Sequence, residues 1–154
     1  MTKIDLDKEK LSQRLIDTAQ AVAELDKYRQ MSLGDFVADK NNFPLASYWL
    51  RLGMEAVLTI ATHILSRLPA NGKKKDYTQI LLSLGDYGVI AKDFSQRIRG
   101  MAGYRNRLVH LYWEVKPEEL LSTIQENLDD FNEFARQIKL FIEKYQLDTE
   151  TSSA

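Results

Sequence analysis

Apolar residues recur at intervals of three and four positions along most of the chain, and this spacing predicts α-helices. The first such stretch covers about residues 5–30, and a second covers about residues 44–67. The second stretch is apolar around most of its circumference, so we expect it to be the central and most buried helix. Pro44 suits the first turn of that helix, where its missing N–H costs nothing.

The second half of the chain contains three further stretches with the same repeat. Residues 77–84 predict a short helix ended by Gly85, and residues 92–111 predict a longer one. Pro117 opens the last helix and is followed by two acids in the first turn, as the helix dipole favours. Apolar positions continue this helix almost to the end of the chain.

Signals for β-strands are almost absent, because no Asn-Gly or Asp-Gly turn separates alternating apolar runs. We therefore predict an all-α fold, an up-and-down bundle of about five helices that forms one domain at residues 1–147. The polar residues 148–154 are expected to form a flexible tail. Phe36 and Val37 are expected to anchor the loop between the first two helices.

Two glycines, Gly100 and Gly103, lie inside the helix predicted at residues 92–111. Each costs about 1 kcal/mol relative to alanine in a helix interior. Their presence indicates either that another backbone approaches closely at this point or that the helix bends there.

The composition excludes several kinds of chemistry. The chain of 154 residues has no cysteine, so disulfides, thiolate catalysis and thiolate zinc sites are excluded. Its two histidines, His63 and His110, do not have the spacing of a familiar metal site. The sequence also lacks a glycine-rich loop and lysine that would cradle a nucleotide. We therefore expect neither a metal nor a cofactor.

The chain is expected to be cytoplasmic and to have no contact with a membrane. Its first residues alternate in charge and lack the apolar core of a signal peptide. No apolar run approaches the roughly 20 residues that span a bilayer. The net charge of −1 also argues against a protein that coats nucleic acid through bulk electrostatics.

Basic residues nevertheless gather in one segment. Residues 92–110 contain five lysines and arginines against one acid, whereas residues 118–133 contain six acids and no base. Two interpretations are open for Arg97, Arg99 and Arg107. Either they line a cleft that binds RNA or the ATP of a partner, or they only offset the acids of the last helix by packing beside it.

Residues 104–112 combine an arginine, a carboxamide, a histidine and a tyrosine at the end of the fourth predicted helix. Asn106 and His110 are four residues apart, so they share one face of a helix, and Arg105 lies close to that face. Histidine gives or takes a proton near neutral pH, and arginine offers two parallel donors to a phosphate. Tyr112 diverges from His110 unless the helix unwinds between them.

This set of side chains can cleave a phosphodiester in RNA without a metal. The reaction needs a base for the 2′-hydroxyl proton, an acid for the leaving 5′-oxygen and positive charge beside the phosphate. One chain supplies one such histidine, His110. A two-fold dimer would supply a base and an acid, so we expect a homodimer that brings two motifs together.

The motif Arg105-x4-His110-x-Tyr112 resembles the signature of the HepT family of HEPN-domain toxins. The similarity covers roughly residues 10–143. Three further segments are similar to parts of that family, namely its second core helix, the entry to its motif helix and its last helix, at residues 58–65, 88–90 and 128–131.

The resemblance implies an all-helical, HEPN-like dimer whose motifs meet in a cleft at the dimer interface. It also implies a metal-independent endoribonuclease, the toxin of a type VII toxin–antitoxin pair. By position in the motif, Arg105 and His110 would be catalytic and Asn106 their polar accessory. The partner would be an MntA-like nucleotidyltransferase antitoxin that transfers AMP from ATP to Tyr112. Phosphates added beside a basic cleft repel RNA and would inactivate the toxin.

Thr59 departs from this resemblance, because relatives commonly carry an acid at its position. If that acid orients the catalytic residues, activity here is weak or absent. The alternative is then a catalytically inactive dimer that docks a nucleotidyltransferase and serves as its substrate or regulatory subunit. A third interpretation is a helical adaptor without nucleotide chemistry. His63 has no similar companions and is expected to cap a neighbouring carbonyl or to lie in an interface.

Overall fold

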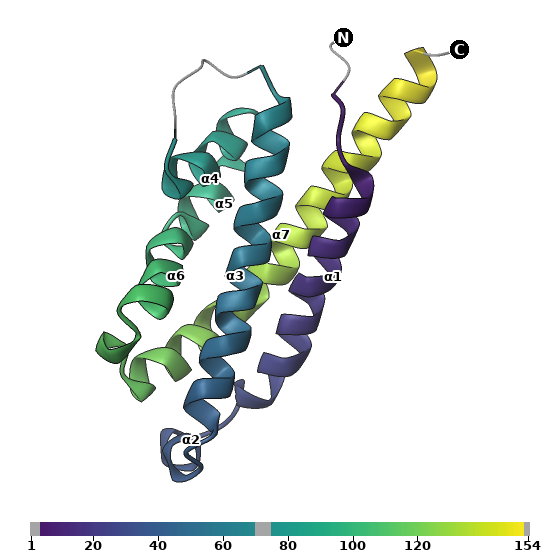
Figure 1. Ribbon diagram of the computed structural model, residues 1–154. Helices are drawn as coiled ribbons and strands as arrows, with labels where there is room; N and C mark the ends of the chain where they lie inside the picture. Colours follow the sequence, from purple (N-terminus) through teal and green to yellow (C-terminus); the bar gives the residue numbers. More distant parts are fainter. Residues whose placement is uncertain (1–3, 70–74, 153–154) are drawn as a thin grey trace.

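A computed structural model describes residues 4–69 and 75–152, and all regular structure in this part of the chain is helical (Figure 1). The predicted all-α class is confirmed. The elements are more numerous than expected, because two stretches contain short additional helices. In chain order they are α1 (Lys8–Leu25), η1 (Asp26–Tyr28), α2 (Leu33–Ala38), α3 (Asn42–Arg67), α4 (Tyr77–Asp86), α5 (Lys92–Ile98), α6 (Met101–His110), η2 (Tyr112–Glu114) and α7 (Pro117–Ser152).

The central helix is α3, as the apolar pattern predicts. It packs against α1, α4, α6 and α7, and Ile60 in its middle is fully buried. Figure 1 shows α1 on one side of α3 and α4, α5 and α6 on the other, while α7 crosses the bundle. Gly53 allows the close approach of two helices, because a Cβ there would lie 3.1 Å from the Phe131 ring and 3.2 Å from Ala21. The core therefore lies where α1 and α7 meet α3.

Gly85 does not end α4, so the boundary predicted at this glycine is wrong. The helix continues to Asp86, and the turn after it is made by Gly88, whose φ of +74° favours glycine. Gly85 is buried against the start of α5. A Cβ at this position would lie 2.8 Å from Ser95 Cβ and 3.2 Å from Lys92 Cα. The glycine is therefore a packing residue between two helices.

The helix predicted at residues 92–111 is in fact two helices, α5 and α6, with a turn at Arg99 and Gly100 between them. Within the described residues, a Cβ built at Gly100 or Gly103 would meet no atom closer than 4 Å. The close approach of another backbone is therefore not found in the part of the chain that the structure describes. The interruption of the helix is the interpretation that holds, and it sets the direction of α6.

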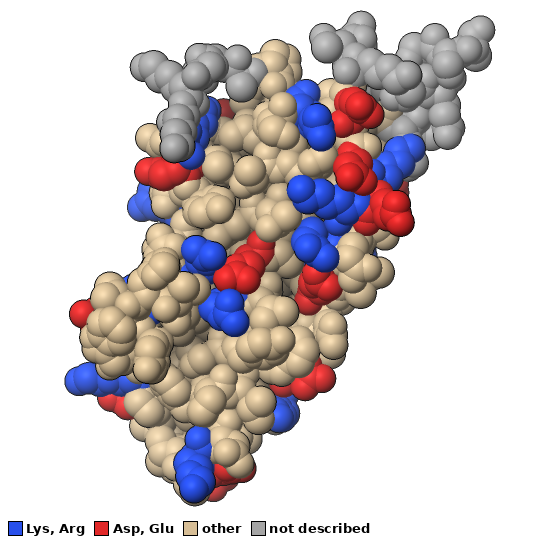
Figure 2. Space-filling model, viewed as in Figure 1, with Lys and Arg blue, Asp and Glu red and all other residues tan. Residues whose placement is uncertain are grey.

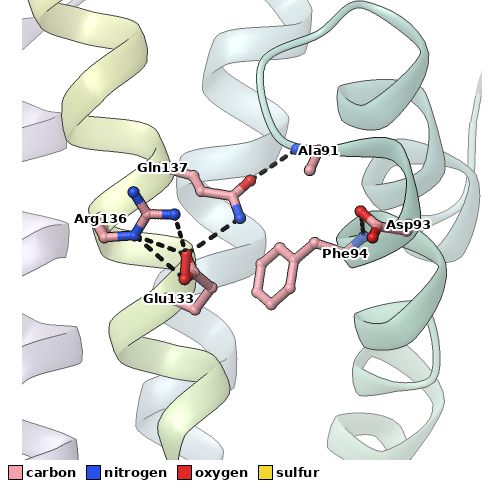
Figure 3. Close-up of polar contacts among 6 residues, drawn as sticks. All are labelled: Ala91, Asp93, Phe94, Glu133, Arg136 and Gln137. Carbon is pink, nitrogen blue, oxygen red and sulfur yellow. Dashed lines mark hydrogen bonds and ion pairs between the residues drawn. The ribbon is translucent and has the colours of Figure 1, made fainter.

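A short series of polar contacts holds the start of α5 against α7 (Figure 3). Gln137 Oε1 accepts a hydrogen bond from Ala91 N at 2.7 Å, and Gln137 Nε2 donates to Glu133 at 3.2 Å. Arg136 Nε also donates to the Glu133 carboxylate, at 2.8 Å. Because α6 follows α5 directly, these contacts help to determine where α6 lies.

The segment between α1 and α3, expected to be a loop, contains the short helix α2. Ser32 caps this helix, since its Oγ accepts a backbone N–H at 3.1 Å. Phe36 is buried, with its ring edge-on to Tyr28 and the two centroids 5.5 Å apart. Val37 is 53% exposed. Phe36 therefore anchors the segment as predicted, and Val37 does not.

The first and last helices differ from their predicted bounds. The stretch predicted at residues 5–30 forms α1 only as far as Leu25, and η1 continues from its end. The last helix begins at Pro117 as predicted but continues to Ser152, beyond residue 147. The division into a domain and a flexible tail stays a prediction, and residues 153–154 lie outside the described part. None of the described helices is long and apolar enough to cross a membrane.

His63 ties the N-terminal segment to α3. Its side chain is buried, and Asp7 N donates to its Nε2 at 3.0 Å. The ring therefore accepts a hydrogen bond from a backbone N–H, which corrects the expected capping of a carbonyl. Burial, followed by the charges of Arg67 and Lys10, lowers the pKa of His63, so the folded protein favours the neutral ring.

This lowered pKa predicts that acid destabilises the protein through His63. The unfolded chain takes up a proton at the ordinary histidine pKa of about 6.5, whereas the folded chain does so only at a lower pH. The contribution of His63 to stability is therefore present above about pH 6.5 and is lost as the pH falls below it. Urea unfolding of the protein and of His63→Gln at about pH 7.5 and about pH 5.5 measures it. An equal loss of stability in both proteins would contradict the prediction.

Candidate active site

The motif residues lie on α6 and at the beginning of η2. Arg105, Asn106 and His110 belong to α6, which ends at His110. The next residue, Leu111, has φ −134° and ψ 34°, so the backbone leaves the helical conformation there. Tyr112 then begins the 3₁₀-helix η2. The α-helix therefore ends between His110 and Tyr112, at the point where the sequence allowed for unwinding.

The Arg105 guanidinium is held by two acceptors. Its Nη1 donates to Asn106 Oδ1 at 3.1 Å, and its Nη2 donates to Glu55 Oε1 at 3.3 Å. The side chain is 24% exposed, so most of it is covered by protein. The guanidinium and the carboxamide of the motif are therefore in direct contact in the fold.

Glu55 is the residue of this site that the sequence interpretation missed. It lies on α3 and is half-buried, and the same Oε1 also accepts from Arg51 Nη1 at 3.2 Å. One carboxylate oxygen thus joins two arginines from neighbouring helices. Thr59 follows Glu55 by four residues on α3, so Glu55 lies one helical turn before the position at which the resemblance implies an acid. The pair Arg51 and Glu55, four apart, is the signal from which it could have been found.

His110 is exposed at the C-terminal end of α6. Its ring has no hydrogen bond or ion pair to any residue that the structure describes. Asn106 precedes it by four residues, so both side chains leave α6 on the same face. The imidazole is therefore exposed on the same face of α6 as Asn106, which holds the Arg105 guanidinium.

Two of the three other candidate arginines are paired with acids of α7. Arg107 donates to both carboxylate oxygens of Glu119, at 2.6 and 3.0 Å, and this contact raises the pKa of its guanidinium. Arg97 pairs with Asp130 at 3.1 Å. Burial raises the pKa of the Asp130 carboxyl, although Arg97 opposes that change. Packing against the acids of the last helix therefore accounts for these two arginines, whereas Arg99 is exposed and unpaired within the described ranges.

Exposed aromatic residues flank the motif. Tyr112 is 58% exposed and Trp113 is 67% exposed, with their rings in an edge-on contact. On α3, Tyr48 is 45% exposed and lies under the Arg51 guanidinium, 5.8 Å from ring centroid to Cζ. In Figure 2 most of the surface over α6 belongs to uncharged residues, and charged residues gather over α1 and the later part of α7. Tyr112 and Trp113 are therefore accessible at the surface.

The described residues contain no group of three or more acids, histidines and cysteines placed to hold a metal ion. What the arrangement offers instead is a guanidinium held by Glu55 and Asn106, with an exposed imidazole on the same helix. Those groups can bind a phosphate and transfer a proton.

The fold and the motif define an all-α protein of the HEPN type. The chain belongs to the family described as Ribonuclease HepT-like, which matches residues 18–138. Two curated relatives are each 29% identical to it. One is "tRNA nuclease HepT" of Aphanizomenon flos-aquae, aligned over 77% of this chain and 80% of its own length. The other is "mRNA nuclease HepT" of Shewanella oneidensis, aligned over 81% of this chain and 96% of its own length.

A solved structure shares the fold. It contains a tri-AMPylated Shewanella oneidensis HEPN toxin in complex with an MNT antitoxin, and the match has a TM-score of 0.74 at 21% identity. The superposition covers 86% of this chain and 98% of that chain. The resemblance to the HepT family inferred from the motif is thereby confirmed, and so is the HEPN-like bundle.

Proposed function

We propose that this protein is a metal-independent endoribonuclease and the toxin of a type VII toxin–antitoxin pair. The proposal rests on the arrangement of α6, in which Arg105 is held by Glu55 and Asn106 while His110 is exposed at the end of the same helix. The names of the two curated relatives, a tRNA nuclease and an mRNA nuclease, support it.

The proposed reaction is an internal transfer of the phosphate in RNA. The 2′-oxygen attacks phosphorus, the bond to the 5′-oxygen breaks, and the products are a 2′,3′-cyclic phosphate and a 5′-hydroxyl. One histidine takes the 2′-hydroxyl proton and a second histidine protonates the 5′-oxygen. Arg105 donates to the non-bridging oxygens and stabilises their charge. Because each chain supplies one His110, we propose a homodimer in which the two motifs face one cleft.

A second candidate function is a catalytically inactive dimer that docks a nucleotidyltransferase and serves as its substrate or regulatory subunit. The exposure of Tyr112, two residues beyond the end of α6, favours it, because an acceptor of AMP must be reached by another protein. The Shewanella oneidensis toxin of the solved complex is described as tri-AMPylated and bound to an MNT antitoxin. Under both functions we propose an MntA-like nucleotidyltransferase as partner and Tyr112 as the acceptor.

One assay separates the two functions. The purified, unmodified protein is incubated with RNA in excess EDTA, and cleavage is expected if it is a ribonuclease toxin. After incubation with the partner and ATP, cleavage by the protein is expected to stop, whereas cleavage by Tyr112→Phe continues. Intact RNA together with AMP uptake on Tyr112 would leave only the second function.

Glu55→Gln is expected to lower the kcat of RNA cleavage about tenfold with little change in stability. Glutamine keeps the size of the side chain but removes the charge that holds the Arg105 guanidinium. A hydrogen bond to a charged group contributes about 1.5–3 kcal/mol, and 1.4 kcal/mol corresponds to a factor of ten. Initial rates over a range of RNA concentrations measure the effect.

The matched control for this prediction is Glu24→Gln, which changes an exposed acid on α1. It is expected to leave kcat unchanged. Thermal unfolding of both variants shows whether a loss of activity arises from a loss of fold. A Glu55→Gln variant with normal kcat would show that Asn106 alone is enough to hold Arg105.

A further inference from the structure

An open groove begins directly beside the motif. It lies between α3, the beginning of α4 and α6, and its volume is about 580 Å³. Its lining includes Ala102, Gly103 and Asn106 on α6, and Thr62 on α3. Sites for small molecules have volumes of about 300–1,000 Å³, so the groove is large enough for a nucleotide.

Asn106 connects this groove to the candidate active site. Its Oδ1 accepts from Arg105 Nη1 at 3.1 Å, and the same residue lines the groove. If one phosphate of a nucleic-acid strand lies at Arg105, the adjacent nucleotide of that strand therefore lies at the entrance of the groove. Gly103 is exposed on α6 and has no side chain, so bare backbone lines the groove at this point.

The lining of the groove suits a nucleotide. Lys75 contributes an ammonium group that donates one hydrogen bond, to Ser83 Oγ at 2.7 Å, and keeps two further N–H donors. Tyr77 is 41% exposed at the rim and offers a ring on which a base can stack. The acid on this rim, Asp76, is occupied as the cap of α4, since its carboxylate accepts from Gln79 N at 2.8 Å.

We propose that this groove binds the nucleotide next to the cleaved phosphate in single-stranded RNA. Lys75 contacts the following phosphate, Tyr77 stacks on the base, and the bare backbone at Gly103 gives the ribose room to lie on α6. The inference rests on the proposed ribonuclease function and adds a substrate-binding site to it. A strand bound in this way runs from Arg105 along α6 toward the beginning of α4.

The experiment uses Gly103→Leu in the full-length protein. A Cβ at Gly103 meets nothing within 4 Å among the described residues, so the helix accepts leucine and the new side chain enters the groove. We expect the KM for RNA and the Kd for a 2′-deoxy-substituted oligonucleotide to rise about tenfold or more, as expected when one stacked base is lost. The matched control is Gly100→Leu, which is equally open but lies outside the groove. Its KM and Kd are expected to be unchanged.

Lys75→Gln provides a second, independent variant. It removes one phosphate contact, so the dependence of log Kd on log salt concentration is expected to become weaker by roughly 0.7, the value for one contact to a single strand. Normal binding by both Gly103→Leu and Lys75→Gln would overturn the proposal. A change in oligomeric state of Gly103→Leu, measured by light scattering, would also overturn it, because a second copy would then cover the groove.

The experiments distinguish an error in the proposed groove from an error in the proposed ribonuclease function. If the unmodified protein cleaves RNA and Gly103→Leu cleaves it with the same KM, the ribonuclease function stands and the groove has no part in it. If the unmodified protein leaves RNA intact, the ribonuclease function falls. The oligonucleotide binding of the two glycine variants still decides whether the groove holds a strand.

Discussion

His110→Ala is expected to lower the rate of RNA cleavage by about 100-fold or more, the usual effect of removing a general acid or base. In a two-fold dimer the substitution removes both imidazoles at once, so the proton acceptor and the proton donor disappear together. Binding of RNA is expected to change little, because Arg105 keeps its contacts to Glu55 and Asn106. Initial rates in excess EDTA, with wild-type and variant at equal concentration, measure the loss.

The control for this prediction is His63→Gln, which changes the other histidine of the chain, on α3. His63 binds Asp7 N and makes no contact with α6 in the hydrogen bonds of the described chain, so this variant is expected to keep full activity while it folds. Equal cleavage by wild-type and His110→Ala would exclude a proton-transfer role for His110. A contaminating ribonuclease would also give equal cleavage by both proteins. Arg105→Ala identifies a contaminant, because cleavage by this variant would then equal that of the wild type as well.

Gly85→Val destabilises the fold by about 2–4 kcal/mol, the range for overpacking combined with strain in a core. A Cβ at this position would lie 2.8 Å from Ser95 Cβ and 3.2 Å from Lys92 Cα, and the Lys92 atom belongs to backbone that cannot rotate away. The start of α5 must therefore move away from α4. A lower midpoint of urea unfolding with an unchanged slope is the expected result.

Gly34→Ala is the matched control for this substitution. Its Cβ would meet only Ser32 Oγ, at 3.9 Å, which is an ordinary contact on the short helix α2. The stability of this variant is expected to equal or exceed that of the wild type, since alanine favours a helix over glycine. A Gly85→Val protein as stable as Gly34→Ala would show that α5 packs less closely on α4 than the contacts indicate.

The long helices of the fold could be predicted from the sequence because their apolar repeats are long and their starts are marked by proline. Pro44 and Pro117 lie in the first turns of α3 and α7, where they were expected. The turn between α5 and α6 could not be predicted in the same way. Apolar spacing continues through Gly100, and it reports which residues face the core without reporting a change of direction.

The candidate site shows the same limit. The relation between Arg105 and Asn106 is local and follows from the motif, and the contact is present in the fold. Glu55 lies 50 residues away along the chain and comes to Arg105 only through the packing of α3 against α6. Arg107 and Arg97 were candidates for phosphate binding, but α7 brings acids to both of them.

The helix that carries the motif, α6, has a smaller share of buried residues than α3, α4 or α5. Only Ala102 and Leu108 are buried among the ten residues of α6, whereas α3 buries twelve of 26. The backbone hydrogen bonds of α6 are thus protected mainly by the helix itself, and such segments open at a lower free energy than the global unfolding of a protein. A second copy or a partner that covers α6 would therefore stabilise the active conformation as well as complete the site.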